Sequence, residues 1–264
     1  MDRLYIPTYD RVGKQLAFDN LPNKWKDKAV LVVHPDEVHE GYPTLSCPVQ
    51  GTGIAPVREW IAQHGQGTRY GVIDDDIEFV YTRKEDEEGP SNIKLDDNMF
   101  DSMINIFNDW MDMGYMHCGA DASWNPPTRD KDHKECGRIC GNVFYDGERL
   151  PVDDIDWTGL PIAEDYYVTL QLLTMGFPNM ISYRARVNPN ETQAKGGCST
   201  FRSLEIHNES MRELQRRFPQ FVKLREKIAK NSGEWSNKVK LAATISWKEA
   251  YKSSQVSTIT DFMV

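Results

Sequence analysis

Short, fully apolar runs separated by longer mixed segments dominate the first third of the chain. Residues 4–6 form one such run, and residues 29–33 (Ala-Val-Leu-Val-Val) form a second. An unbroken apolar run of this length is typical of a strand buried on both faces of a parallel sheet. Residues 12–28 between them are long enough for a crossover containing helix, which a parallel pair requires. The pattern therefore predicts the start of a doubly wound α/β layer.

A third apolar run, residues 70–73, ends in three consecutive carboxylates before apolar character resumes at Ile77. Like charges at the end of a core strand repel one another unless a cation or an array of donors lies among them. In extended chain Asp74 and Asp76 leave the backbone on the same side. That spacing suits one hard divalent ion that takes its remaining ligands from phosphates and water. A solvated acidic turn is the alternative.

Helical and strand patterns continue along the chain. Pro56 opens a helix over 57–64 that carries Arg58 in its first turn. Residues 96–113 show an apolar stripe at three- and four-residue steps, typical of a helix packed on a core. Glu164 and Asp165 precede a helix over 166–175, where the positive end of the helix favours carboxylates. The remaining segments are predicted as strands at 48–51, 115–120, 138–145, 180–187 and 241–247, and as a basic helical region at 204–230.

Composition narrows the class of protein. The 264 residues are 39% hydrophobic and 27% charged, which allows one large domain or two small ones. No apolar run reaches the roughly 18 residues of a membrane span, and the N-terminus does not resemble a signal peptide, so no membrane partner is expected. Five cysteines at irregular spacing favour a reducing, cytoplasmic location. The net charge of −9 disfavours broad binding to nucleic acid but leaves room for a local basic face at 212–230.

Four segments, taken in order, resemble GT-A-type glycosyltransferases. They are Ile-Pro-Thr-Tyr-Asp-Arg at 6–11, Gly-Ile-Ala-Pro-Val-Arg-Glu-Trp at 53–60, Val-Ile-Asp-Asp-Asp-Ile at 72–77, and the Ala-Glu-Asp-Tyr-Tyr segment that begins at 163. Together with the late Lys-Gly-Gly at 195–197, they look most like the phage and kinetoplastid enzymes that glycosylate hydroxymethylpyrimidines in DNA, such as the base J glucosyltransferase group. The resemblance implies a single α/β GT-A domain, Rossmann-like, with a mostly parallel mixed sheet flanked by helices. It implies a nucleotide-sugar half at about 1–82, an acceptor half at about 93–203, and a C-terminal basic helical region and terminal strand at 204–264.

The resemblance also implies roles for residues that match the family's motifs, with Mn2+ or Mg2+ as cofactor and a UDP-sugar as donor. The loop after the first strand would hold the nucleotide, the acidic motif would hold the metal and part of the nucleotide, and the Glu-Asp pair would supply the catalytic base. The implied nucleotide-sugar contacts are Thr8, Tyr9, Arg11, Arg58, Asp74, Asp75, Lys195, Gly196 and Gly197. The implied metal ligands are Asp74, Asp76 and the candidate His207, and the implied catalytic residues are Asp165 and Glu164.

The expected acceptor is a hydroxymethylated pyrimidine of DNA, in the host cytoplasm if a phage encodes the enzyme. A base inside a duplex cannot reach Asp165, so the nucleotide must be flipped or single-stranded. Trp124, Trp157 and Tyr166 are the aromatic candidates for stacking on it. A glycan or small-molecule acceptor stays open, as do the donor sugar, the stereochemical outcome and the oligomeric state.

Two other classes remain open from the residues. A metal-dependent nuclease or phosphoryl-transfer enzyme would use the same aspartates, with further carboxylates around two metals. A zinc-stabilised interaction module would use a group of histidines and cysteines that falls within 24 positions, although it meets no complete zinc motif. Its members are His117, Cys118, His133, Cys136 and Cys140.

Overall fold

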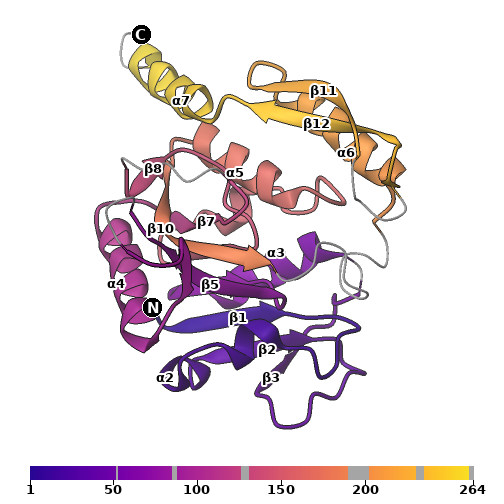
Figure 1. The fold of residues 1–264 in the computed structure, drawn as a ribbon. Coiled ribbons are helices and arrows are strands. Elements are labelled where there is room, and N and C mark those ends of the chain that lie inside the picture. The colour runs from indigo at the N-terminus through magenta and orange to yellow at the C-terminus, as the bar shows by residue number, and fades with distance from the viewer. Residues whose placement is uncertain (52, 85–87, 126–130, 190–201, 230–234, 262–264) are drawn as a thin grey trace.

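The computed structural model describes residues 1–51, 53–84, 88–125, 131–189, 202–229 and 235–261. Within these residues ten strands form one mixed sheet in the order β3-β2-β1-β4-β9-β7-β10-β5-β6, with β8 paired to β10 off that path (Figure 1). The predicted α/β class with a mixed sheet flanked by helices is confirmed. The strands are β1 Arg3–Pro7, β2 Ala29–Val33, β3 Thr44–Ser46, β4 Arg69–Ile73, β5 Ile77–Thr82, β6 Asn92–Lys94, β7 His117–Ala122, β8 His133–Glu135, β9 Asn142–Asp146 and β10 Asn179–Pro189.

The first half of the sheet is parallel, as the apolar runs predict. β1 pairs in parallel with β2 on one side and with β4 on the other, and every residue of β2 is buried. The crossover from β1 to β2 contains the short helices α1 (Leu16–Asp19) and α2 (Asn23–Lys26). This arrangement brings the carboxyl ends of β1 and β4 to the same edge of the sheet, where α/β proteins bind ligands.

The strand predicted at 48–51 is wrong. The strand beside β2 is β3, and the chain after it turns so that Gln50 donates hydrogen bonds from Nε2 to the carbonyl oxygens of Thr8 (2.8 Å) and Val32 (2.9 Å). Pro48 has no N–H to give to a strand ladder. The glutamine side chain therefore ties this turn to the ends of β1 and β2.

Antiparallel pairing dominates the second half of the sheet. β9 lies between β4 and β7 and is antiparallel to both, and β5 is antiparallel to β10 and β6. β10 is parallel to β7, with a register shift between Ser182 and Arg186. The sheet is continuous across residue 82, so the division into two halves at that point stays a prediction.

Helices cover both faces of the sheet. On one face α4 (Asp97–Asp112) and the β1–β2 crossover bury Phe107 and Trp25 against the strands. On the other face α3 (Ile54–His64), the short 3-10 helix η1 (Val152–Asp154) and α5 (Glu164–Thr174) bury Val57 and Val168. The predicted α4 stripe is confirmed apart from Ile106, which is 46% exposed.

The last part of the described chain forms a separate layer, here called the C-terminal module (residues 204–261). It contains α6 (Leu204–Arg217), an antiparallel ribbon of β11 (Val222–Ile228) and β12 (Val239–Ile245), and α7 (Trp247–Asp261). Figure 1 shows the ribbon and α6 beyond α5, away from the main sheet. A core of α5, α6 and ribbon side chains, including Leu170, Leu214 and Val222, joins the module to the rest of the chain.

The prediction of a helix over 204–230 is therefore wrong in its second half. Pro219 stops α6 two residues after its end, because a proline cannot continue the helical hydrogen bonds. Beyond it, Val222 and Leu224 alternate with Lys223 and Arg225, which is the two-residue period of a strand. The charge of the segment concealed that alternation.

No helix among the described residues is both long and apolar enough to cross a lipid bilayer. Four cysteines fall in the described ranges, and all four are free thiols. The described residues also contain no group of three or more histidine, cysteine, aspartate or glutamate side chains arranged to hold a metal ion. The zinc prediction is contradicted there: Cys118 packs in the core against α4, and Cys136 packs beside α5.

Candidate active site

The acidic motif lies where β4 ends, next to the loop that follows β1. Thr8 Oγ1 donates a 2.6 Å hydrogen bond to Asp75 Oδ2. Arg11 Nη1 contacts Asp75 Oδ1 and lies 3.0 Å from Asp76 Oδ2. The predicted nucleotide loop and the acidic motif therefore form one cluster, and Arg11 supplies the cation that the repelling carboxylates require.

A second arginine joins the acidic motif to the catalytic pair. Arg58, the fifth residue of α3, is 8% exposed. It places Nη2 3.0 Å from Asp74 Oδ1 and Nε 3.3 Å from Glu164 Oε1. These residues come from α3, the end of β4 and the start of α5. Burial of one cation between two carboxylates is stable only when both stay paired, so Arg58 fixes the spacing between the two motifs.

Asp165, the next residue, pairs with a different arginine. Arg138 Nε donates a 2.6 Å hydrogen bond to Asp165 Oδ2, and its guanidinium lies 4.2 Å from the centre of the Tyr166 ring. Ala163, which precedes the pair, has a φ of 66°. A non-glycine residue in the left-handed region is strained, and such strain is typical of functional sites. Glu164 and Asp165, which follow this turn, pair with different arginines.

Burial shifts the acid-base properties of the cluster. It raises the pKa of Asp75 to about 6, although Arg11 and the Thr8 hydroxyl act in the opposite direction. Burial also raises the pKa of Asp74 and of Glu164, in both cases against the attraction of Arg58. Desolvation disfavours the charged form of each carboxylate. A bound cation would offset that penalty.

Five other predicted residues remain, of which the structure describes Tyr9 and His207. Tyr9 packs its ring against Gly51, where a Cβ atom would lie 3.1 Å from the ring, so the glycine is needed for this contact. Lys195, Gly196 and Gly197 fall outside the described residues. His207 lies in α6, where Nε2 is hydrogen-bonded to the Leu241 carbonyl at 2.8 Å and the ring packs on Trp235. These contacts give no support to His207 as a metal ligand.

The acidic motif fits a divalent cation that shares its ligands with a substrate. The side chains of Asp74 and Asp76 are both about one-third exposed, at 35% and 32%, whereas Asp75 is buried. Among the described residues, the only ion pair of Asp76 is with Arg11, through one oxygen. Mg2+ and Mn2+ need only one or two carboxylates when phosphates and waters supply the other ligands. The absence of a larger ligand group from the described residues is consistent with such a shared site and not with a cage made by the protein alone.

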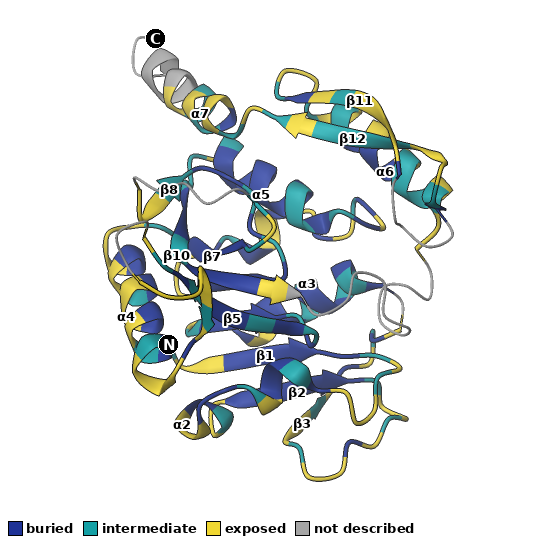
Figure 2. Ribbon diagram, in the orientation of Figure 1, coloured by how far each residue is buried: buried dark blue, intermediate teal, exposed yellow. Residues whose placement is uncertain are grey.

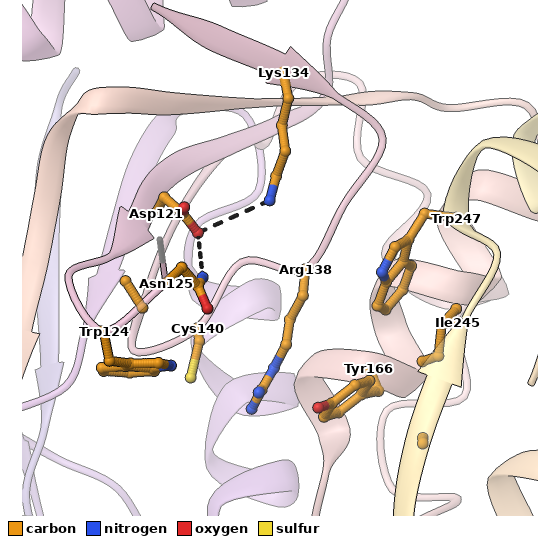
Figure 3. Close-up of a pocket in the computed structure, with 11 residues that line it drawn as sticks. Asp121, Trp124, Asn125, Lys134, Arg138, Cys140, Tyr166, Ile245 and Trp247 are labelled. Atoms are coloured by element: carbon orange, nitrogen blue, oxygen red, sulfur yellow. Dashed lines mark hydrogen bonds and ion pairs between the residues drawn. The ribbon is translucent and has the colours of Figure 1, made fainter. Parts of the chain in front are cut away.

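A pocket of about 240 Å³ lies on the other side of Arg138 (Figure 3). Arg138, Cys140 and Tyr166 form the side nearest Asp165. Trp124 forms another wall and is 56% exposed. Ala243, Ile245 and Trp247 of the C-terminal module close the pocket, and the Trp247 ring is stacked on Tyr166 at 5.9 Å.

Polar groups line the far end of the pocket. Asp121 accepts a 2.7 Å hydrogen bond from Asn125 Nδ2, and Lys134 Nζ lies 3.8 Å from Asp121 Oδ1 (Figure 3). Arg186 lies behind them, 2% exposed, and donates to the carbonyl oxygens of Ala122 and Asn125. A ring-sized space with aromatic walls and fixed hydrogen-bonding groups suits a polar ring such as a sugar or a pyrimidine.

Sequence reasoning found part of this pocket. Trp124 and Tyr166 were predicted to stack on an acceptor, and both line the pocket. The same prediction for Trp157 is wrong, because this residue is 2% exposed and donates from Nε1 to the Val152 carbonyl. The sequence did not single out Arg138, Lys134 or Trp247. The spacing of these residues shows no local pattern, since the fold alone brings them together.

Comparison with known proteins gives consistent matches. A model of the family described as TET-Associated Glycosyltransferase matches residues 3–197. Two relatives are named beta-glucosyl-HMC-alpha-glucosyl-transferase: that of Enterobacteria phage T6 is 29% identical and that of phage T2 is 28% identical, each over 236 residues. In both cases the match covers 83% of this chain and 82% of the relative. Among solved structures, S. aureus TarS 1–349 in complex with UDP aligns with a TM-score of 0.45 and 12% identity, covering 83% of this chain and 66% of that one.

Proposed function

The chain belongs to the family of TET-associated glycosyltransferases, and from this premise we propose that it moves glucose from UDP-glucose to a hydroxyl group on a hydroxymethylated pyrimidine in DNA. Because the members of this family are glycosyltransferases, the nuclease alternative is set aside. The identities of the donor, the metal and the acceptor are what we propose. The observation that carries it is the hydrogen bond between Arg138, which lines the ring-sized pocket, and Asp165, which lies next to Arg58 and Glu164 of the buried cluster.

In this proposal the donor occupies the edge formed by the β1 loop and the acidic motif. Thr8, Tyr9 and Arg11 hold the nucleoside and the first phosphate, and Arg58 keeps Asp74 in position. Asp76, with Asp74, would hold Mn2+ or Mg2+, which when bound neutralises charge on the diphosphate leaving group. Arg11 and Arg58 are the described cations nearest to that charge, and fixed cations of this kind stabilise a leaving group as it departs.

The acceptor ring occupies the pocket, against Trp124 on one side and Tyr166 on another. A bond forms between the acceptor oxygen and the anomeric carbon of glucose, the bond from that carbon to the diphosphate breaks, and UDP leaves. Asp165 accepts the hydroxyl proton, and Arg138 holds its carboxylate in place through Oδ2. General base catalysis needs such a group within hydrogen-bond reach of the hydroxyl.

A second acceptor is supported by the names of the two phage relatives, which give beta-glucosyl-HMC as the acceptor. In that case the attacking hydroxyl belongs to a glucose already attached to the base. The hydrogen-bonding groups of Asp121, Asn125 and Lys134 at the end of the pocket suit the several hydroxyls of a sugar.

Both acceptors are tested in one assay. Labelled UDP-glucose and Mn2+ are incubated with the enzyme and with three DNAs that carry unmodified, hydroxymethylated or beta-glucosylated hydroxymethylated cytosine. Label should enter one or both modified DNAs and not the unmodified DNA, and chelation of the metal should stop it. If no label enters any DNA with several UDP-sugars while the enzyme still binds UDP, the DNA acceptor is wrong.

A further inference from the structure

We propose that the outer face of the β11–β12 ribbon binds the phosphate backbone of the duplex DNA that carries the acceptor. This inference rests on the DNA acceptor of the proposed function. The sequence predicted a basic helix as the DNA-binding surface, and the surface proposed here is the ribbon that follows that helix. The outer face comprises Lys223, Arg225, Lys227, Lys240, Ala242 and Thr244.

The register of the ribbon separates two unlike faces. Lys223 pairs with Thr244, Arg225 with Ala242, and Lys227 with Lys240, so these side chains share one face. The opposite face carries Val222, Leu224, Ala243 and Ile245, which pack into the core of the module. The outer face thus has four basic residues and no acidic one, in a chain whose net charge is −9.

The outer cations are available for an external anion. Lys223, Arg225 and Lys227 are exposed, and Figure 2 draws exposed residues of β11 in yellow. No carboxylate among the described residues forms an ion pair with these three side chains. The helix differs in this respect. Arg216 lies 2.6 Å from Glu213, and Arg217 lies 2.7 Å from both Glu213 and Asp156. Two of the helix cations are therefore already neutralised.

One cross-strand pair of residues on the outer face destabilises the ribbon when no anion is bound. Lys227 and Lys240 lie directly opposite each other on neighbouring strands. Like charges at such positions destabilise an antiparallel pair, and the described structure provides no carboxylate to relieve them. An anion that binds across the two strands would remove this repulsion.

The geometry also suits the partner. Alternate residues of a strand lie about 7 Å apart, on the scale of the repeat of a polynucleotide backbone. Two-stranded ribbons are among the elements that bind in the major groove of duplex DNA. Ala243 and Ile245, on the opposite face of β12 from Lys240, form a wall of the pocket. The pocket and the outer face are therefore two sides of the same ribbon, and a nucleotide flipped out of DNA held on the outer face would pass the edge of the ribbon to enter the pocket.

Two double variants of equal charge test the surface. R225Q/K227Q removes two outer-face cations, and R212Q/R216Q removes two cations from α6 of the same module. Binding of a labelled unmodified duplex is measured by fluorescence anisotropy over a salt series, without donor. For R225Q/K227Q we expect a roughly tenfold loss of affinity at low salt and a salt slope smaller by about two, one for each phosphate contact. R212Q/R216Q should match the wild type.

The thermal midpoint separates a binding role from a structural one. Because Lys227 faces Lys240, R225Q/K227Q should melt at the wild-type temperature or above it, whereas cations needed for folding would lower it. Equal weakening in the two variants, loss only in R212Q/R216Q, or no binding by the wild type would each overturn the inference. Since no sugar transfer is measured, ribbon-dependent binding would stand even if the glucose-transfer assay failed.

Discussion

Arg138 and Asp165 form a 2.6 Å ion pair between Nε and Oδ2, at the boundary between the donor carboxylates and the acceptor pocket. Through this pair one oxygen of the Asp165 carboxylate is held by an arginine that lines the pocket. Its neighbour Glu164 is instead held on the other side by Arg58. Two adjacent carboxylates thus have separate cations and, in the proposed mechanism, separate duties.

Asp165→Asn should lower turnover by about two to four orders of magnitude, because the amide cannot accept the acceptor proton. Donor affinity, measured by calorimetry with UDP-glucose, should stay near the wild-type value. Glu164→Gln is the matched control and should act mainly on stability. Normal turnover with weaker donor binding in Asp165→Asn would assign this residue to the donor.

The product of the wild-type enzyme gives an independent check on Asp165. A single displacement assisted by a base inverts the anomeric carbon, so the base role of Asp165 requires a β-linked product from an α-linked donor. The alpha-glucosyl transfer in the names of the two phage relatives would instead retain the configuration. NMR coupling constants of the transferred glucose report the linkage. An α-linked product would exclude single displacement and with it the base role of Asp165.

Trp124→Ala should raise the Michaelis constant for the acceptor by about 5- to 100-fold, since stacking on one ring contributes about 1–3 kcal/mol. The Michaelis constant for the donor should not change. Trp157→Ala is the contrasting variant: this buried side chain should cost about 3–5 kcal/mol of unfolding free energy. If the Michaelis constant for the acceptor does not change in Trp124→Ala, the acceptor does not bind in this pocket.

Asp76→Ala should abolish the metal-dependent part of UDP binding, measured with and without Mn2+. Its effect on unfolding free energy should stay below about 1 kcal/mol, because the lost ion pair is partly exposed and Arg11 keeps Asp75. Metal-dependent binding equal to that of the wild type would show that Asp76 is not a ligand.

Arg58→Met should reduce the free energy of unfolding by about 3–5 kcal/mol, because it leaves Asp74 and Glu164 buried without their cation. Chemical denaturation followed by circular dichroism measures the loss. Arg216→Gln removes an exposed cation and should change stability by no more than about 0.5 kcal/mol. Similar losses in the two variants would show that Arg58 does not hold the motifs together.

Stability should fall as the pH rises through the range in which Asp75 ionises. The pKa of Asp75 is raised to about 6 by burial, from an ordinary value of 3.8, so between these values the folded protein binds more protons than the unfolded chain. Folding is then favoured at the acidic end, and this group accounts for about 3 kcal/mol across the window. Urea denaturation from pH 4 to pH 7 should show a shallower decline for Asp75→Asn, because asparagine does not titrate. Equal slopes would contradict the shift.

Most of the elements around the acidic motif, where the donor is proposed to bind, could be predicted from the sequence because each depends on a local pattern. The apolar run of β2 and the Asp74–Asp76 sequence at the end of β4 are visible without any knowledge of the fold. The contacts made by Arg58 depend on a local pattern only in part. Its position early in the helix before β4 was predicted, but its ion pair with Glu164 joins residues more than a hundred positions apart.

The acceptor side was less predictable, for a physical reason. Its walls come from the β7–β8 region, the start of α5 and the end of β12, so no single segment carries the pattern of a pocket. The basic segment after Pro219 was predicted as helix because its charges were counted together. The alternation of Val222 and Leu224 with Lys223 and Arg225 was the signal that distinguishes a strand.

Trp247 and Ile245 close the pocket from a part of the chain that the family match, residues 3–197, does not reach. The pocket is therefore built from two parts of the chain, only one of which the family model spans. Under the proposed function, changes after residue 197 would alter one wall of the acceptor pocket and leave the carboxylate cluster untouched. Exchange of this terminal portion between relatives should then change which modified base is accepted.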